Sequence, residues 1–122
     1  MSKKSSVIGI PDYSRAQNLG TPSLTTPELT EISYTMPDDG WFFYRSVGSN
    51  LIWDKPAVLK VNGKLLVSSQ ITGENSLVDL DGILPVKKGD IVTLSGIHYH
   101  INKFINGVHV SWSAFFIPNR TR

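Results

Sequence analysis

The sequence predicts an all-β protein, folded as a sandwich or barrel of roughly eight to ten strands. Short β-rich runs are separated by Gly, Pro and Asn-Gly turns, which is typical of antiparallel strands joined by tight connections. No stretch of the sequence spaces apolar residues at i, i+3, i+4 and i+7 over several turns, so no amphipathic helix is predicted. A length of 122 residues suits one domain.

Residues 1–30 differ in composition from the remaining residues. Residues 7–19 (VIGIPDYSRAQNL) are expected to form one short strand that breaks at Pro11, because proline cannot donate to a strand ladder. Residues 20–30 contain two prolines and four threonines, as in an extended connector. We therefore expect an extended N-terminal arm, residues 1–30, that is ordered only against a partner surface, and a β-sandwich head, residues 31–122.

The first part of the head predicts two strands and a loop. Residues 31–36 alternate apolar and polar side chains, and residues 37–40 (PDDG) are typical of a turn. Residues 41–47 (WFFYRSV) follow as a strand with aromatic side chains on both faces. Residues 48–55 are expected to form a loop that carries Trp53.

Asn62-Gly63 predicts a β-hairpin, because this dipeptide favours the tight turn that joins two antiparallel strands. The strands are residues 57–61 and 64–68. The two-residue turn sets a register in which Leu59 lies opposite Leu66. The same register places Val58 opposite Val67.

The following residues predict further short strands. Residues 73–82 are polar and are expected to be mainly loop, with a short strand. Residues 83–86 contain Pro85 and are expected to lie at a sheet edge. Residues 87–90 (KKGD) predict a turn that leads into a strand over residues 91–95.

A last hairpin is predicted around Asn106-Gly107, with Ile105 opposite Val108. Its register gives one almost entirely apolar face and one face that carries all three histidines. The apolar face is predicted to contain Ile97, Tyr99, Ile101, Lys103, Ile105, Val108, Val110, Trp112, Ala114 and Phe116. The other face is predicted to contain His98, His100, Asn102, Phe104, His109, Ser111, Ser113 and Phe115.

Two strands carry large apolar groups on both faces, which predicts a contact surface between subunits. In a sandwich one face of each sheet meets the core and the other meets water, and residues 41–44 and 115–117 break that pattern. Exposing such a face costs about 25 cal/mol per Å² relative to burying it. The alternative is a strand covered by its own loop, for example the loop with Trp53. The residues predicted at the subunit interface are Trp41, Phe43, His98, His100, Phe104, His109, Ser111, Ser113 and Phe115.

Composition excludes several classes of partner. The net charge of +2 is too small to indicate nucleic-acid binding. The absence of cysteine excludes disulfides and zinc-thiolate sites. No apolar run approaches the length of a membrane span, and residues 1–20 lack the apolar segment of a signal peptide. We expect a protein made in the cytoplasm, with no membrane and no cofactor.

Three groups of residues are candidates for chemical sites. His98 and His100 share one strand face about 7 Å apart, which suits a metal, but interface histidines without metal are the favoured interpretation. A pH-sensitive interface is the milder alternative. The pairs Asp38-Asp39 and Asp79-x-Asp81 adjoin glycines and are interpreted as turn formers. With no nucleophile motif and no phosphate loop, we expect no enzyme. Trp53 either stacks on a sugar ring or packs against the core.

Four motifs, in the right order, resemble trimeric jelly-roll domains of the tumour-necrosis-factor and complement-head type. They are residues 34–41 (YTMPDDGW), the hairpin 61–63 (VNG), residues 84–92 (LPVKKGDIV) and residues 115–118 (FFIP). Small bacteriophage fibre proteins show the same pattern, often with a leading segment similar to residues 10–15 (IPDYSR). The likeness covers about residues 10–118. A long shaft and a collagen stalk, which related proteins carry, are both missing from this sequence.

The resemblance implies a homotrimeric virion protein with a jelly-roll head. The function expected from it is a head fibre or capsid decoration protein that docks on the particle through its N-terminal arm and binds host-surface or mucosal glycans. A tail-fibre tip that binds a receptor and a monomeric carbohydrate-binding module that uses Trp53 are the alternatives. The residues expected to anchor the arm are Lys3, Lys4, Val7, Ile8, Ile10, Pro11, Tyr13 and Arg15.

Overall fold

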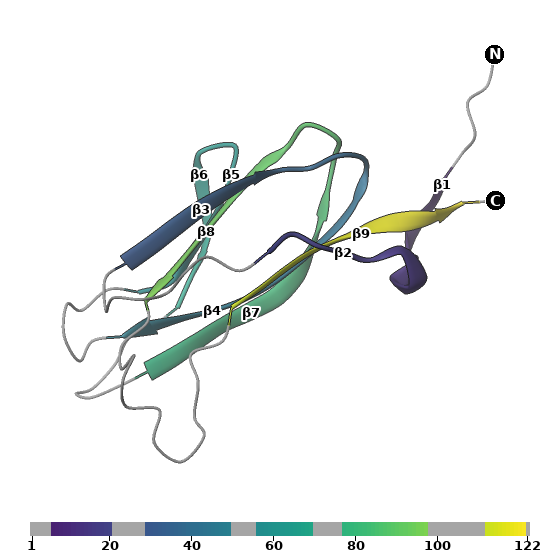
Figure 1. Cartoon of the computed structure of the whole chain (residues 1–122). Helices are drawn as coiled ribbons and strands as arrows, with labels where there is room; N and C mark the ends of the chain where they lie inside the picture. The colour runs from purple at the N-terminus through teal and green to yellow at the C-terminus, as the bar shows by residue number, and fades with distance from the viewer. Residues whose placement is uncertain (1–5, 21–28, 50–55, 70–76, 98–111, 122) are drawn as a thin grey trace.

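The computed structural model describes residues 6–20, 29–49, 56–69, 77–97 and 112–121. These residues form two antiparallel β-sheets that pack face to face, as Figure 1 shows. Among them the helical structure is limited to η1, a single 3-10 turn over Tyr13–Arg15. The predicted all-β sandwich is confirmed at this level.

The first sheet has the strand order β1-β9-β4-β7, and β2 also pairs with β9. β4 and β9 are its central strands, and β7 forms one edge, as predicted for the segment that contains Pro85. The strands are β1 (Ser6–Pro11), β2 (Gln17–Asn18), β4 (Gly40–Ser49), β7 (Leu77–Val86) and β9 (Ser113–Thr121).

The second sheet has the order β3-β8-β5-β6. Its strands are β3 (Leu29–Thr35), β5 (Val58–Val61), β6 (Lys64–Ser68) and β8 (Ile91–Ile97). The predicted Asn62-Gly63 turn is confirmed: both residues have positive φ, 52° and 83°, and they join β5 to β6. The predicted register is wrong beyond Leu65, because Leu66 is an extra residue that bulges from β6. Leu59 therefore pairs with Val67, which packs against the core, and Leu66 stays exposed.

The core lies between the two sheets and is built from the side chains that alternate inward. Phe42 and Phe116 are its largest fully buried members. The Phe42 ring contacts Tyr34 of the opposite sheet at 5.8 Å and Tyr44 of its own strand at 6.0 Å, measured between ring centroids. Trp112 is 8% exposed, and its Nε1 donates to the Tyr34 hydroxyl at 3.0 Å. A polar link also joins the sheets.

That link is the buried Ser46 hydroxyl of β4, which donates to the Ser95 carbonyl oxygen of β8 at 2.6 Å. Both serines are fully buried, so each polar group needs a partner inside the protein. The Ser95 hydroxyl accepts from the backbone N–H of Val58 at 3.0 Å. The two sheets are thus held in a fixed relative position by a directional contact as well as by packing.

The predicted pairing of residues 97 and 116 is wrong. β8 and β9 lie in different sheets: Ile97 pairs with Leu29, and Phe116 lies between Phe42 and Gln17. The Asn106-Gly107 turn lies outside the described residues. The predicted inward direction of Trp112, Ala114 and Phe116 is nevertheless confirmed, because β4 takes the place expected for the preceding strand.

Two predicted loops are shorter than expected. Residues 77–82 belong to β7, which pairs with β4 along its whole length from Leu77 to Val86. Ser49 is the last residue of β4, so the strand runs into the predicted loop 48–55, of which residues 50–55 lie outside the described residues. Only a short strand was predicted within residues 73–82, because aspartates and a glycine interrupt the apolar pattern there.

The N-terminal segment 6–20 is part of the sandwich. β1 and β2 both pair with β9 of the same molecule, and the strand ends at Pro11 as predicted. The Leu19 backbone N–H donates to the Ala114 carbonyl at 2.8 Å, and the Leu19 side chain packs against the core. The expectation that the arm is ordered only on a partner is therefore corrected for this segment.

Gly40→Ala is expected to destabilise the protein strongly. A Cβ at this position would overlap the Ile117 carbonyl oxygen and lie 2.9 Å from two atoms of the Phe116 ring. The carbonyl belongs to the neighbouring strand and cannot move without shifting β9. Overpacking of this kind costs about 1–3 kcal/mol or more. Chemical denaturation should show a lower unfolding free energy. An unchanged denaturation midpoint would contradict the close approach of Gly40 to β9.

Candidate functional site

The outer face of the first sheet carries an apolar surface, which we call the aromatic face. It consists of Trp41, Phe43, Ile83, Pro85 and Phe115. Direct cross-strand pairing aligns these side chains in two rows, Pro85-Trp41-Ile117 and Ile83-Phe43-Phe115. The Phe43 and Phe115 rings meet edge to face with centroids 6.3 Å apart. Ile117, in the first row, is buried but is not part of the core cluster.

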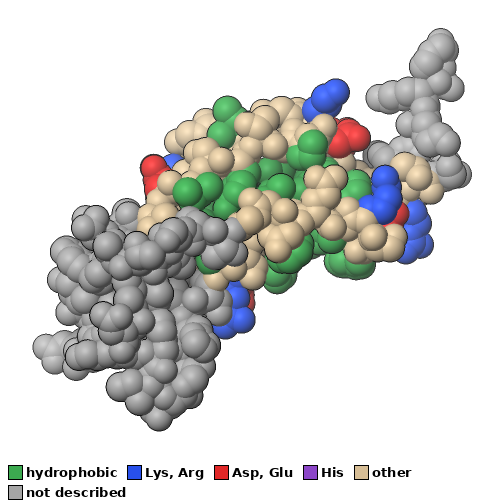
Figure 2. Space-filling model, in the orientation of Figure 1, with side chains coloured by type: hydrophobic (Ala, Val, Ile, Leu, Met, Phe, Trp, Pro, Cys, Tyr) green, Lys and Arg blue, Asp and Glu red, His purple; other side chains and the backbone are tan. Residues whose placement is uncertain are grey.

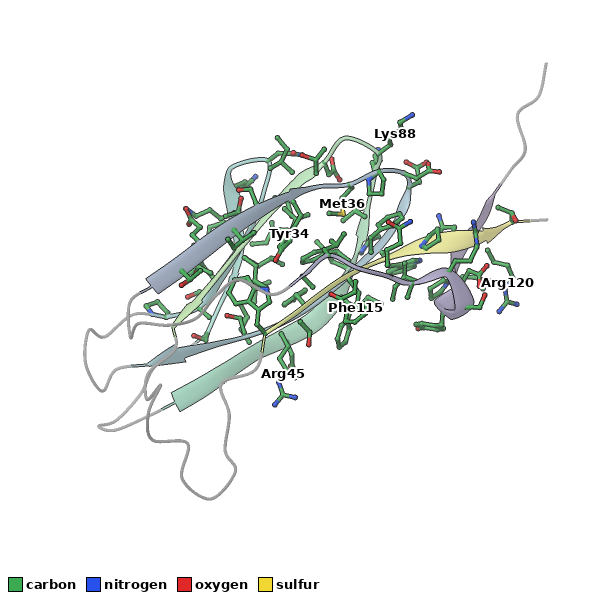
Figure 3. All side chains as sticks on the ribbon, in the orientation of Figure 1. Tyr34, Met36, Arg45, Lys88, Phe115 and Arg120 are labelled. Atoms are coloured by element: carbon green, nitrogen blue, oxygen red, sulfur yellow. The ribbon has the colours of Figure 1, made fainter. Side chains whose placement is uncertain are left out.

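The aromatic face is open to solvent in the single molecule. Ile83 is 43% exposed and Phe43 is 38% exposed. Figure 3 shows Phe115 and Arg45 projecting from the same side of the sheet, away from Tyr34 and Met36, which lie between the layers. Hydrophobic side chains also reach the surface in the space-filling view of Figure 2. Contiguous apolar surface of this kind usually marks an interaction site.

The outer face of the second sheet differs in character. Its central rows carry Glu31, Ser33, Thr35, Lys60 and Thr93. Ser33 and Thr93 share a hydrogen bond at 2.8 Å, and Lys60 lies 3.9 Å from Glu31. Exposed apolar side chains also occur on this sheet among the described residues: Ile91 at the start of β8, and Leu65 and Leu66 on the edge strand β6. The central rows of the second sheet are thus mainly polar on their outer side, whereas those of the first sheet are mainly apolar.

One end of the aromatic face becomes polar. The next row along the strands holds Asp81, Arg45 and Ser113. Burial raises the pKa of the Tyr44 hydroxyl, and the nearby charge of Asp81 raises it further. Asp81 lies in strand β7, so its predicted role as a turn former is wrong. A negative and a positive side chain thus lie at this rim of the aromatic face. The surface is apolar in the middle and polar at this edge, as is typical of protein interfaces.

The other end of the face is fixed by the N-terminal segment. Trp41 Nε1 donates to the Asn119 side-chain oxygen at 2.9 Å, and Arg15 Nη2 donates to the Asn119 carbonyl at 2.8 Å. Arg15 also forms an ion pair with Asp12 at 2.8 Å. Hydrogen bonds from the Ser14 side chain and from Arg15 lower the pKa of the Asp12 carboxyl. This network orients the Trp41 indole ring and attaches η1 to β9.

The predicted anchor residues are placed as follows. Pro11 and Arg15 lie against β9, where Pro11 pairs with Asn119. Ile10 is 41% exposed and Tyr13 is 66% exposed. Val7 and Ile8 belong to β1, and nothing is described of their side chains. Lys3 and Lys4 lie outside the described residues.

Some of the predicted interface residues lie within the described ranges and others lie outside them. Trp41, Phe43, Ser113 and Phe115 share the outer face of the first sheet, as predicted from the alternation of side chains. The remaining members of that set, the candidate metal pair and the candidate sugar-stacking residue lie outside the described ranges: His98, His100, Phe104, His109, Ser111 and Trp53. Within those ranges no group of three or more metal-ligating side chains occurs.

Sequence reasoning missed Ile83 and Pro85 as members of the face. Their alternation with the buried or half-buried Leu84 and Val86 was a usable signal, because strand side chains alternate between faces. The Arg15-Asn119 contact joins residues 104 positions apart and had no local signal.

The aspartate pair at 38–39 has a structural role. Asp38 Oδ1 accepts from the Asp39 backbone N–H at 2.8 Å, and Asp39 Oδ1 accepts from the Lys88 N–H at 2.9 Å. The predicted turn-forming role of this pair is therefore confirmed. Asp79 lies in β7, and its side chain is outside the described set.

Asp90 is expected to make folding stability depend on pH. The Lys87 N–H and then the Asn62 side-chain amide donate to its carboxylate, and both lower its pKa. Its stabilising effect is therefore complete above the pKa of an unfolded Asp, about 3.9, and is lost as pH falls through the lower folded value. Asp90→Asn should flatten the loss of unfolding free energy on acidification, measured by urea denaturation. Parallel acid profiles for the two proteins would contradict the assignment.

Comparison with protein-family models, curated proteins and solved structures finds no match to this sequence. No helix in the part of the protein that the structure describes is long and apolar enough to cross a membrane. What the described residues define is an all-β sandwich with an apolar outer face on one sheet.

Proposed function

We propose that this protein is a structural component of a bacteriophage particle, a homotrimeric head fibre or capsid decoration protein with a jelly-roll head. The observation that carries the proposal is the aromatic face, which places five apolar side chains on the solvent side of one sheet. Self-association would bury this surface, and burial of apolar area is favourable. Closed cyclic symmetry is the common way for identical subunits to cover such a face.

The strand order supports a jelly-roll head. Consecutive strands alternate between the sheets: β3 lies in the second, β4 in the first, β5 and β6 in the second, β7 in the first, β8 in the second and β9 in the first. A jelly roll is a double-sheet sandwich built from two Greek keys, and it requires such crossing between sheets. Two of the motifs that carry the resemblance lie at turns: Asn62-Gly63 joins β5 to β6, and residues 87–90 form the turn before β8.

Attachment to the particle is proposed to use the N-terminal segment. β1, η1 and the end of β9 lie together at one end of the molecule (Figure 1). Because the backbone of residues 6–20 already pairs with β9, we propose that this segment contacts a capsid or other virion protein through side chains. Ile10 and Tyr13 are exposed there. Lys3, Lys4, Val7 and Ile8 complete the proposed anchor.

The test has two parts. Light scattering on the purified full-length protein should give the mass of three copies, and immunogold labelling of particles from the phage that carries this sequence should decorate the head. A monomer that binds a glycan array would favour the carbohydrate-binding module, and labelling of the tail would favour the tail-fibre tip. Absence of the protein from purified particles would overturn the proposal.

The same proposal assigns no catalytic role and no cofactor. Its support is that Asp38 and Asp39, which are adjacent in the sequence, accept hydrogen bonds from backbone amides. Binding of host-surface glycans is proposed to be weak at each site and strengthened by the presence of three copies.

A further inference from the structure

Asn62, in the turn between β5 and β6, makes three hydrogen bonds to Asp90 and Ile91. Its side-chain Oδ1 accepts from the Ile91 backbone N–H at 2.9 Å, and its Nδ2 donates to Asp90 Oδ1 at 3.1 Å. Its own backbone N–H donates to the Ile91 carbonyl at 2.8 Å. The amide group of Asn62 is thus fixed at both its oxygen and its nitrogen.

Asp90 is itself positioned to keep this contact. The Lys87 N–H donates to its other carboxylate oxygen at 2.9 Å, and its backbone carbonyl accepts from the Met36 N–H at 2.8 Å. These contacts favour the ionised carboxylate, which is the form that accepts a hydrogen bond from an amide NH₂. The link therefore joins the β5-β6 turn to the β7-β8 turn.

The sequence Asn62-Gly63 is chemically vulnerable. The backbone nitrogen of Gly63, which carries no side chain to hinder its approach, can attack Cγ of Asn62. The new bond between this nitrogen and Cγ closes a five-membered succinimide as the Cγ–Nδ2 bond breaks and ammonia leaves. Water then opens the ring at either carbonyl, which gives aspartate or isoaspartate. The attack requires the Asn62 amide group to rotate toward its own backbone, away from Ile91 and Asp90.

We propose that Asn62 is a latent deamidation site and that Asp90 protects it by holding the side-chain amide away from the Gly63 nitrogen. Because these contacts must break before the ring closes, their free energy adds to the barrier of deamidation. Deamidation would also place a second carboxylate beside Asp90 and remove the NH₂ donor. The modified turn would then repel the β7-β8 turn, so loss of the protection would also separate the two turns.

Peptide mapping by mass spectrometry tests the proposal during incubation of the full-length protein at mildly alkaline pH. Deamidation at Asn62 in Asp90→Ala should be about tenfold faster than in the wild type, as expected for loss of one charge-assisted hydrogen bond. The rate of a synthetic peptide over residues 58–67 gives the unprotected limit. Asn106-Gly107, the other Asn-Gly of the sequence, serves as an internal reference in every sample.

A matched variant separates protection from general loosening of the turn. Gly89 has a φ of 88° with open space around it, so Gly89→Ala strains the same turn but leaves the Asp90 carboxylate in place. This variant should keep Asn62 close to the wild-type rate. Equal acceleration in both variants, or a wild-type rate equal to that of the peptide, would overturn the proposal. The peptide comparison needs no substitution, so it decides the question even if Asp90→Ala does not fold.

Discussion

Replacing Phe43 and Ile83 by lysine is expected to convert the proposed trimer into folded monomers. Both side chains are exposed in the single molecule and are cross-strand partners at the centre of the aromatic face. In the assembly they would be buried, and lysines there would bring like charges together without partners. Anchor residues at the centre of an interface are worth about 2–4 kcal/mol each, so the double substitution should abolish association. Light scattering gives the molar mass directly.

The second sheet provides a matched control. Leu65 and Leu66 of β6 are 54% and 52% exposed, so they are at least as accessible as Phe43 and Ile83 but lie away from the aromatic face. Leu65→Lys with Leu66→Lys adds the same charge and removes similar apolar surface. This protein should keep the wild-type molar mass. The opposite result, in which the β6 variant dissociates and the Phe43/Ile83 variant keeps the mass of a trimer, would place the interface on the second sheet.

Phe42→Ala is expected to produce the largest loss of stability of any single substitution considered. The ring is completely buried and contacts Tyr34 and Tyr44, so its removal leaves a cavity between the sheets. Truncation of a buried Phe costs about 3–5 kcal/mol, which is a large part of the total for a domain of this size. Urea denaturation followed by tryptophan fluorescence should show a much lower midpoint.

The neighbouring residue is the natural comparison. Phe43→Ala removes the same ring from the opposite face of β4, where the side chain is partly exposed. Its unfolding free energy, measured at concentrations too low for association, should change much less than that of Phe42→Ala. If both variants lose equal stability under those conditions, the assignment of inner and outer faces is wrong.

Turns and single strands could be predicted from the sequence, because the signals for them lie within a few neighbouring residues. The Asn62-Gly63 turn and the alternation of Phe42 and Tyr44 with Trp41 and Phe43 depend on backbone preference and on the two-residue period of a strand. These signals predicted the hairpin between β5 and β6 and both faces of β4. They also identified the three members of the aromatic face that lie on β4 and β9, Trp41, Phe43 and Phe115.

Which strands pair with each other was harder to predict, because pairing between distant segments has no local signal. The sequence placed Phe116 beside Ile97, whereas the hydrophobic alternation of β9 is equally satisfied by pairing with β4. The first half of β7 was predicted to be mainly loop for a related reason. Gly82 looked like part of a loop, but the Tyr44 hydroxyl lies 2.6 Å from where a Cβ would be, so a side chain at this position would force Tyr44 to shift. Only the position of Tyr44 in the folded protein reveals this requirement.

The pairing of β1 and β2 with β9 has a consequence for any shortened version of this protein. A version that begins at residue 31 would leave one side of β9 with unsatisfied ladder groups next to Phe115 and Ile117. Uncovered strands of this type recruit strands of other molecules and lead to aggregation. We therefore expect the segment proposed as the virion anchor also to limit aggregation, so expression vectors should retain it.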